Sequence, residues 1–269
     1  MEFKSPENLP DLINNVISSA SQTRFYRPLV KNIHRITNIE DFKHVPITQI
    51  SELREANLKD TISSPENLQW IGGPYRGRCS QSIAIAEGMK ETAIRYDLFQ
   101  DAIKDSIEIN QIKKAAIVTS SLHNLYSAEI STILNSIAIP THIFVDDGNS
   151  KSFDMAQRLN PDILIILTDH DLPQHITDSN QLLITFRKSH PIYKQLQLDI
   201  YMIDELGFLG HSTDLLTWKI YNDQYLYERS NEGNLVVTSL RNKTQPMLRI
   251  DTGDPVLTLS KYSMKLGEL

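Results

Sequence analysis

Cysteine is almost absent from this sequence, because Cys79 is the single one in 269 residues. A lone cysteine excludes an intramolecular disulfide framework and fits a reducing compartment. Glycine is also scarce, with 10 residues. Two groups of glycines stand out, Gly72, Gly73 and Gly77 in the first and Gly207 and Gly210 in the second. Because glycine allows tight backbone geometry, we look for function at these groups.

Long hydrophobic runs are missing as well. No stretch of about 18 apolar residues exists, so the sequence predicts no membrane-spanning helix. The N-terminal residues include acids and prolines where a secretory signal needs a basic start and an apolar run. Positive charge is not in excess, because 27 Lys and Arg face 33 Asp and Glu for a net charge of −6, which opposes a broad nucleic-acid-binding face. We therefore expect a cytoplasmic protein without membrane or nucleic-acid partners.

The sequence does contain enough apolar residues for a large core, at 40% of the chain. Through the first 60 residues they recur at helical spacing, in 9–17 and again in 25–33. Thr48 is predicted to cap a third helix. A longer amphipathic helix is predicted from Ala84 to Ile109.

Short, continuously apolar runs follow this helix. They occupy residues 115–120, 142–146, 163–168 and 182–186. Helical patterns lie between the first three runs, which predicts a doubly wound, mostly parallel sheet. Beyond Tyr201 the runs are separated by turn residues, and they cover 218–221, 225–229, 235–240 and 247–250. These later runs predict antiparallel strands.

The expected fold class is therefore α/β, in one compact domain. Its parts are a helical opening at 1–60, a parallel α/β part at about 84–205 and an antiparallel β part at about 206–269. No low-complexity linker separates these parts. No Gly-Xaa-Gly-Xaa-Xaa-Gly follows a strand, which disfavours a dinucleotide-binding domain of the Rossmann type.

Two neighbouring segments carry a family resemblance, Gly233-Asn-Leu-Val-Val-Thr-Ser-Leu-Arg241 and Pro246-Met-Leu-Arg-Ile-Asp-Thr-Gly-Asp254. They resemble the Gly-Glu-Leu-Val-Val-Thr strand and the Pro-Leu-Ile-Arg-Tyr-Arg-Thr-Gly-Asp segment of adenylate-forming enzymes, most closely the phenylacetate–CoA ligase-like branch of the acyl-CoA synthetases. Tyr201-Met-Ile-Asp-Glu205 occupies the place of the family's Tyr-Gly-Leu-Ser-Glu motif. Upstream, Phe25-Tyr-Arg27 and Glu52-Leu-Arg54 are similar in order and spacing to the helical opening of that branch. The resemblance covers nearly the whole chain, as the N-terminal domain of the family.

The resemblance implies roles for three of these residues. Asp254 would hold the ribose hydroxyls of ATP or AMP, and a carboxylate suits a vicinal diol because it accepts two hydrogen bonds. Glu205 would ligate magnesium and act in catalysis, as a hard oxygen ligand. Tyr201 would form the wall beside the adenine.

The counterpart of the family's phosphate loop is Gly72-Gly-Pro-Tyr-Arg-Gly-Arg-Cys79. Gly77 and the positive charge of Arg78 align with the family loop, and Arg78 is the second catalytic candidate. Arg76 and Arg78 would bind phosphate through bidentate hydrogen bonds. The resemblance thus implies an ATP/AMP site with magnesium.

The implied function is a truncated acid–thiol ligase of the AMP-forming type, which activates a small carboxylic acid as acyl-AMP. The expected small-molecule partner is a small carboxylic acid or an acyl thioester, and CoA and a carrier protein both remain open as acceptor. The family's small lysine-bearing C-terminal domain is expected to be absent, since the chain ends at Leu269 soon after Asp254. We expect a partner chain to supply that domain.

An alternative remains open, a catalytically inactive pseudoenzyme that serves as a ligand-binding or protein-interaction module. The loop at 72–79 lacks the serines and threonines of the family's phosphate loop. Met202 replaces a glycine that lets the backbone approach the nucleotide, and Asp204 replaces a hydroxyl residue with a charge that repels phosphate. These changes favour the alternative.

Overall fold

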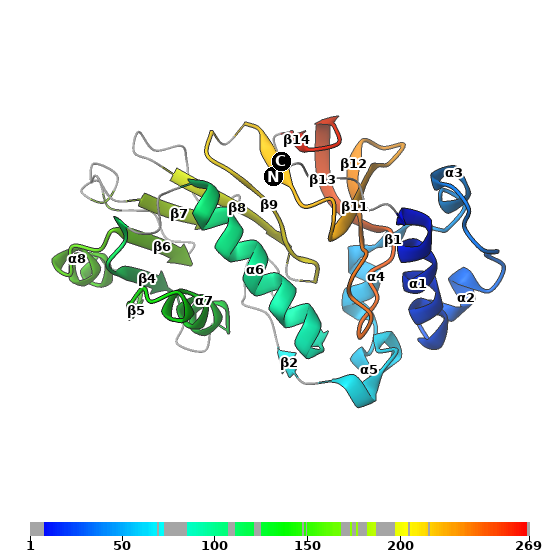
Figure 1. Ribbon diagram of the computed structural model, residues 1–269, viewed down its shortest axis with the longest axis horizontal. Helices are drawn as coiled ribbons and strands as arrows, with labels where there is room; N and C mark the ends of the chain where they lie inside the picture. Colours follow the sequence, from blue (N-terminus) through cyan, green and yellow to red (C-terminus); the bar gives the residue numbers. More distant parts are fainter. Residues whose placement is uncertain are drawn as a thin grey trace.

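The computed structural model describes residues 8–68, 70–72, 85–106, 111–120, 125–146, 148, 150–167, 173, 176, 182–186, 197–203, 205–214 and 216–267. Figure 1 shows an elongated molecule, with short helices at one end, an α/β layer at the other and a long sheet that runs between them. Within the described ranges, N-terminal helices are followed by parallel strands and then by antiparallel strands. The predicted α/β fold class is confirmed.

Short helices form the N-terminal part. They are α1 (Leu9–Gln22), α2 (Arg27–Val30), α3 (Ile39–Phe42), α4 (Ile50–Glu55), α5 (Leu58–Thr61) and a 3-10 turn at Pro65–Asn67. The predicted apolar stripe of α1 is confirmed, because it buries Ile13 and Val16. The second helix is shorter than its predicted range of 25–33, since the Phe25 N–H donates to the Asp60 carbonyl at 2.9 Å instead of joining a helix.

Thr48 is not a helix cap, contrary to the prediction. It belongs to β1 (Thr48–Gln49) and pairs in parallel with Ile250. Helix α4 begins after Gln49, whose backbone N–H donates to the Glu52 carboxylate at 3.0 Å. Because Thr48 pairs with β13, the helix begins at Ile50 instead of directly after Thr48.

The parallel part matches the predicted runs closely. Its strands are β4 (Ala115–Thr119), β5 (Thr141–Val145), β6 (Ile163–Leu167), β7 (Leu182–Phe186) and β8 (Gln197–Ile203), which lie in the order β5-β4-β6-β7-β8. Ile117, Ile165 and Ile184 stand side by side on β4, β6 and β7. Each neighbouring pair of these strands is parallel.

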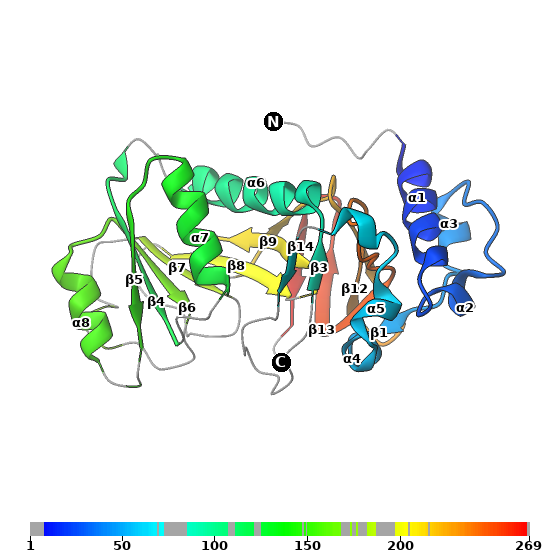
Figure 2. The same ribbon diagram turned by 90° about the horizontal axis from the view of Figure 1, so that it is seen from below.

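Helices cover both faces of the parallel strands, as predicted. They are α6 (Met89–Ser106), α7 (Leu125–Ser136) and α8 (Lys151–Arg158). The side chains of α6 and α7 join the core that contains Ile117 and Ile165, and both helices lie over one side of the sheet (Figure 2). Phe153 of α8 packs in a second cluster, with Val118 and Leu164 on the opposite face. The sheet is therefore doubly wound.

The long helix starts later than predicted. Residues 84–88 were expected to be helical, but Ile85–Glu87 form β3, which pairs antiparallel with β2 (Trp70–Gly72). Only after Gly88 does α6 begin. The first residues of the segment predicted as a helix thus form one strand of a two-stranded antiparallel ribbon.

The antiparallel part extends the same sheet. Its strands are β9 (Gly207–Ser212), β10 (Trp218–Ile220), β11 (Tyr225–Arg229), β12 (Asn234–Ser239), β13 (Ile250–Leu259) and β14 (Ser263–Leu266). The full order is β11-β12-β13-β14-β10-β9-β8-β7-β6-β4-β5, and β1 pairs with β13 beside this path. The direction changes at β8 and β9, which pair antiparallel. The strand predicted at 247–250 is wrong, because β13 begins only at Ile250, after Arg249 adopts a positive φ of 47°.

Two glycines of the second group have structural reasons. Gly207 starts β9 with a φ of +82°, which favours glycine. At Gly210 a Cβ atom would lie 2.5 Å from the Lys219 carbonyl oxygen on β10. Gly73 and Gly77 lie outside the described residues. In the part of the chain that the structure describes, no helix has the length and apolar character to cross a bilayer.

Candidate functional site

The structure brings together Tyr201 and Asp254, two of the predicted site residues. Tyr201 lies on β8 and Asp254 on β13, and the tyrosine hydroxyl donates to Asp254 Oδ2 at 2.5 Å across 53 positions of sequence. Both are buried, with 1% of Tyr201 and 6% of Asp254 exposed. The Tyr201 ring also packs edge to face on Trp218, with 5.7 Å between the ring centroids.

A tight turn positions Asp254. Gly253 has a φ of +71°, and its N–H donates to Asp251 Oδ1 at 2.8 Å. The Asp254 N–H donates to the Thr252 hydroxyl at 3.1 Å. These bonds fix the Thr-Gly-Asp segment through its own short side chains, which is typical of Asp and Thr in turns.

An ion pair fixes Arg249, three residues before this segment. Arg249 contacts Glu228 of β11 through two nitrogens, at 3.1 and 3.0 Å. Its Nη1 also donates to the carbonyl oxygens of Lys43, at 2.8 Å, and of Val45. Burial raises the pKa of Glu228, and the positive charge of Arg249 opposes that rise. Arg249 thus joins the N-terminal part of the chain to the strand that carries Asp254.

Glu205 lies in the turn between β8 and β9. Arg54 of α4 places its Nε 2.6 Å from Glu205 Oε1, across 151 positions of sequence. The Glu205 side chain is 1% exposed and that of Arg54 is 21% exposed. Glu205 Oε2 is buried and has no hydrogen-bond partner among the described residues. Arg54 appears in the Glu52-Leu-Arg54 segment, but no spacing in the sequence signals a partner so far away.

The remaining predicted site residues are not placed. Arg76, Gly77 and Arg78 lie outside the described residues, as does Asp204. The predicted phosphate loop therefore stays a prediction. In the described ranges no three His, Cys, Asp or Glu side chains gather as metal ligands would.

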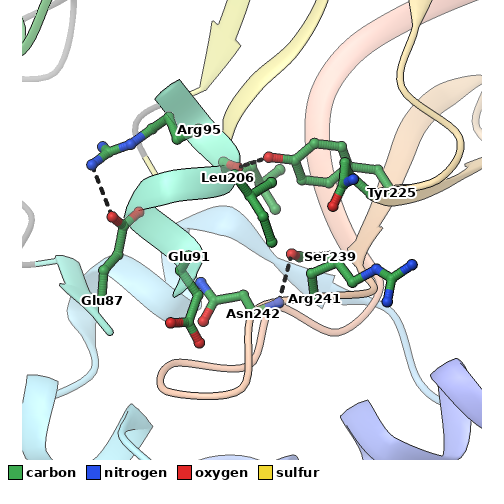
Figure 3. A pocket seen from close by; sticks show the side chains of 10 residues that line it. Glu87, Glu91, Arg95, Leu206, Tyr225, Ser239, Arg241 and Asn242 are labelled. Carbon is green, nitrogen blue, oxygen red and sulfur yellow. Dashed lines mark hydrogen bonds and ion pairs between the residues drawn. The ribbon is translucent and has the colours of Figure 1, made fainter. Parts of the chain in front are cut away.

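A separate polar pocket borders the β8–β9 turn at Leu206. It encloses about 350 Å³, part of it open solvent, and is lined by Glu87, Glu91, Ile94, Arg95, Leu206, Gln224, Tyr225, Ser239, Arg241 and Asn242 (Figure 3). The Tyr225 hydroxyl donates to the Leu206 carbonyl oxygen at 2.7 Å, which ties one wall of the pocket to the β8–β9 turn. Sequence analysis missed this pocket, although Glu91 and Arg95 share one face of α6.

Arg95 holds two buried carboxylates beside the pocket. Its Nη2 lies 2.8 Å from Glu87 Oε2 and 2.6 Å from Glu129 Oε1. Burial raises the pKa of Glu129 to about 7, against the opposing effect of Arg95 and with a smaller contribution from Glu87. This group therefore binds a proton near neutral pH.

Comparisons with known proteins agree on the fold. No protein-family model and no curated protein matches the sequence. Among solved structures, 2-hydroxyisobutyryl-CoA ligase in complex with 2-HIB-AMP and CoA is similar with a TM-score of 0.71 at 15% identity, over 98% of this chain and 68% of that chain. The acyl acid amido synthetase AtGH3.15 in complex with 2,4-DB gives 0.58 at 11% identity, over 96% and 66%.

A third similar structure is the amide bond synthetase McbA from Marinactinospora thermotolerans, with a TM-score of 0.51 at 11% identity, over 76% of this chain and 49% of that chain. The chain thus spans between 49% and 68% of the length of these three proteins. Identities this low show similarity of fold and do not select a branch. Over nearly its whole length this chain is similar in fold to the CoA ligase and to the acyl acid amido synthetase.

Proposed function

We propose that this chain binds an adenine nucleotide and a small carboxylic acid, as the N-terminal part of an AMP-forming ligase of the phenylacetate–CoA ligase-like branch. The contact between Tyr201 and Asp254 is the observation that carries the proposal. These are the two positions that the sequence resemblance assigns to the nucleoside, and the fold brings them together from distant strands. Asp254 can accept from the tyrosine and from a ribose hydroxyl together, because a carboxylate has about four acceptor positions.

The chemistry in this proposal is formation of an acyl-AMP. A carboxylate oxygen of the acid attacks the α-phosphorus of ATP and forms a new O–P bond. The bond from the α-phosphorus to the oxygen that bridges to the β-phosphate breaks, and pyrophosphate leaves. On this chain, Tyr201 and Asp254 would orient the nucleoside, and Arg76 and Arg78 would meet the phosphate charge. CoA or a carrier protein would be the acceptor.

A second candidate function is a pseudoenzyme that binds a ligand without turnover. The ion pair between Arg54 and Glu205 favours it, because the predicted magnesium ligand already has a positive partner at 2.6 Å. Magnesium requires octahedral oxygen ligands at about 2.1 Å and usually keeps several waters. With Arg54 in contact, the Glu205 side chain is 1% exposed, which leaves no room for such a shell. These residues do not fit magnesium in the described conformation.

Calorimetric titration with AMP and with ATP tests nucleotide binding. We expect saturable binding that Asp254→Asn weakens about tenfold or more, since a charged hydrogen bond to a hydroxyl is worth about 2 kcal/mol. Asp199→Asn is the control, because Asp199 is comparably buried, on β8, and accepts from the Thr185 hydroxyl at 2.9 Å. Absence of binding in the wild-type protein would overturn the proposal.

Pyrophosphate exchange separates the two candidate functions. A carboxylate-activating enzyme exchanges labelled pyrophosphate into ATP when its acid is present. A panel of small aliphatic and aromatic acids is tested with the wild-type chain and with Asp254→Asn. Exchange that depends on Asp254 supports the ligase, whereas nucleotide binding without exchange for any acid favours the pseudoenzyme.

A further inference from the structure

We infer that Arg54 is the built-in cation of this site, that it takes the position at Glu205 of a divalent metal, and that the site therefore binds AMP without a divalent metal. The choice of ligand rests on the proposed nucleotide site. The assignment of Arg54 rests on its own geometry.

The contact has the features of a charge-neutralising pair. The distance of 2.6 Å between Arg54 Nε and Glu205 Oε1 is that of a short, charge-assisted hydrogen bond. Glu205 is enclosed, and an unpaired carboxylate there would carry a large desolvation cost. The positive charge of the Arg54 guanidinium offsets this desolvation cost without an added ion.

The position of Arg54 in the fold makes the cation permanent. Arg54 lies in the last turn of α4, and α4 contacts both β1 and β13. Figure 2 shows α4 beside these two strands. Because β13 also carries Asp254, the same packing that orients the nucleoside candidate holds the guanidinium at Glu205. A divalent ion would have to displace this arginine.

Charge balance then selects the ligand. Among the described residues proposed for the nucleotide, Glu205 and Asp254 are acidic, and Arg54 is the positive partner of Glu205. Arg76 and Arg78, which the proposed function assigns to the phosphate, lie outside the described residues. A triphosphate without a metal brings several negative charges to these carboxylates, and like charges repel strongly at a buried site. AMP brings a single phosphate. Metal-free binding therefore favours the monophosphate.

A purely structural ion pair is the competing explanation. In that case Arg54 would anchor α4 to the β8–β9 turn, and its removal would alter stability but not the response to metal. The test therefore measures metal dependence, with stability as a separate readout.

The main experiment is AMP titration with magnesium and with EDTA. Wild-type affinity should change less than about twofold between the two, because no metal takes part. Arg54→Met should lose about tenfold in EDTA and regain affinity when magnesium is added. Arg54→Lys keeps the charge and should behave like wild type. Wild-type binding that is about tenfold tighter with magnesium would overturn the inference.

The double variant Arg54→Met/Glu205→Gln provides the charge control. It removes both charges, so its AMP affinity in EDTA should return to within about threefold of wild type. Urea unfolding of each variant reports on folding. If Arg54→Met does not fold, the wild-type and Arg54→Lys titrations still decide the question.

Mn²⁺ titration without nucleotide, followed by electron paramagnetic resonance, tests Arg54 independently of the proposed function. We expect no bound Mn²⁺ in the wild-type protein and one bound ion in Arg54→Met that is lost in the double variant. Mn²⁺ binding by wild type that Glu205→Gln abolishes, or no binding by folded Arg54→Met, would overturn the inference. Failure of all nucleotides to bind would remove the proposed function and the ligand preference, while this titration would still decide the role of Arg54.

Discussion

In the parallel strands β4, β6 and β7 every residue is buried, and all are apolar except Thr119 and Thr185. The antiparallel strands and the helices packed on them instead bury charged pairs, such as Arg249 with Glu228 and Arg54 with Glu205. The first region is stabilised by apolar area removed from water, which is not directional. The second depends on partners at defined distances, because a buried charge without its partner is costly. Of the predicted nucleoside contacts, Asp254 lies in this second region, and Tyr201 lies on β8, which pairs in parallel with β7 and antiparallel with β9.

The largest expected effect is loss of the Arg249 guanidinium. Arg249→Ala should lower the free energy of unfolding by about 4 kcal/mol, because it leaves Glu228 buried without its ion-pair partner. Urea denaturation measures this. Arg249→Lys keeps the charge but not the two-nitrogen contact, so its loss should be smaller. If Arg249→Ala lowers the free energy of unfolding by less than about 1 kcal/mol, this ion pair contributes no more than an exposed pair, and the contrast between the two regions is wrong.

In the parallel region the corresponding test is a cavity. Ile165 is fully buried between β4 and β7. Ile165→Ala should therefore lower the free energy of unfolding by about 3 kcal/mol, and the more conservative Ile165→Val should lower it by about 1 kcal/mol. Both follow from urea denaturation. Combined with Arg249→Ala, the losses should add to within about 0.5 kcal/mol because the sites share no partners. Strong non-additivity would show that the two regions are coupled.

The pH dependence sharpens the comparison at Glu129. Its pKa is raised from 4.5 to about 7, so the folded protein binds a proton that the unfolded chain has released. Stability contributed by this group is full below about pH 4.5 and is lost as pH rises to about 7, by at most about 3 kcal/mol, since one pKa unit corresponds to about 1.4 kcal/mol.

Glu129→Gln tests this dependence. The difference in unfolding free energy between wild type and the variant should fall across that pH window. Glu91→Gln is the control, because Glu91 accepts from the backbone N–H groups of Lys243 and Thr244. A wild-type-minus-Glu129→Gln difference that stays constant with pH would contradict the prediction.

The smallest expected effect concerns the predicted nucleoside contact. Tyr201→Phe removes the hydroxyl that donates to Asp254. Urea denaturation should show that the free energy of unfolding falls by about 2 kcal/mol, as expected for a hydrogen bond to a charged group. Tyr227→Phe is the matched control, because the Tyr227 hydroxyl donates at 2.5 Å to the neutral Leu209 carbonyl oxygen. Its loss should lower the free energy of unfolding by about 1 kcal/mol. Equal losses in the two variants would show that the Asp254 charge adds nothing.

Local patterns in the sequence predicted the parallel region closely. The runs at 115–120, 163–168 and 182–186 match β4, β6 and β7 within one residue at each end. Such strands are buried on both faces, so their apolar character is continuous and visible in the sequence. In the antiparallel region the prediction failed at 247–250, where the positive φ of Arg249 delays the strand. An arginine gives no local signal of that conformation.

The roles of the candidate site residues stay predictions. The resemblance named Tyr201, Glu205 and Asp254, and the contact between Tyr201 and Asp254 agrees with a shared location. It assigned no role to Arg54. Side chains that meet across 151 residues leave no periodicity to detect, because their contact depends on how α4 packs against the sheet.

The sequence by itself determined the order of helices and strands, the doubly covered parallel sheet and the residues of the Thr-Gly-Asp turn, because each depends on periodicity or on neighbours within a few positions. Only the tertiary structure decided that Thr48 joins a strand, that Arg95 lies between Glu87 and Glu129, and that Glu205 receives an arginine. These outcomes follow from burial. A buried hydrogen-bonding or charged group must find a partner wherever the packed chain supplies one, and local sequence does not specify that partner.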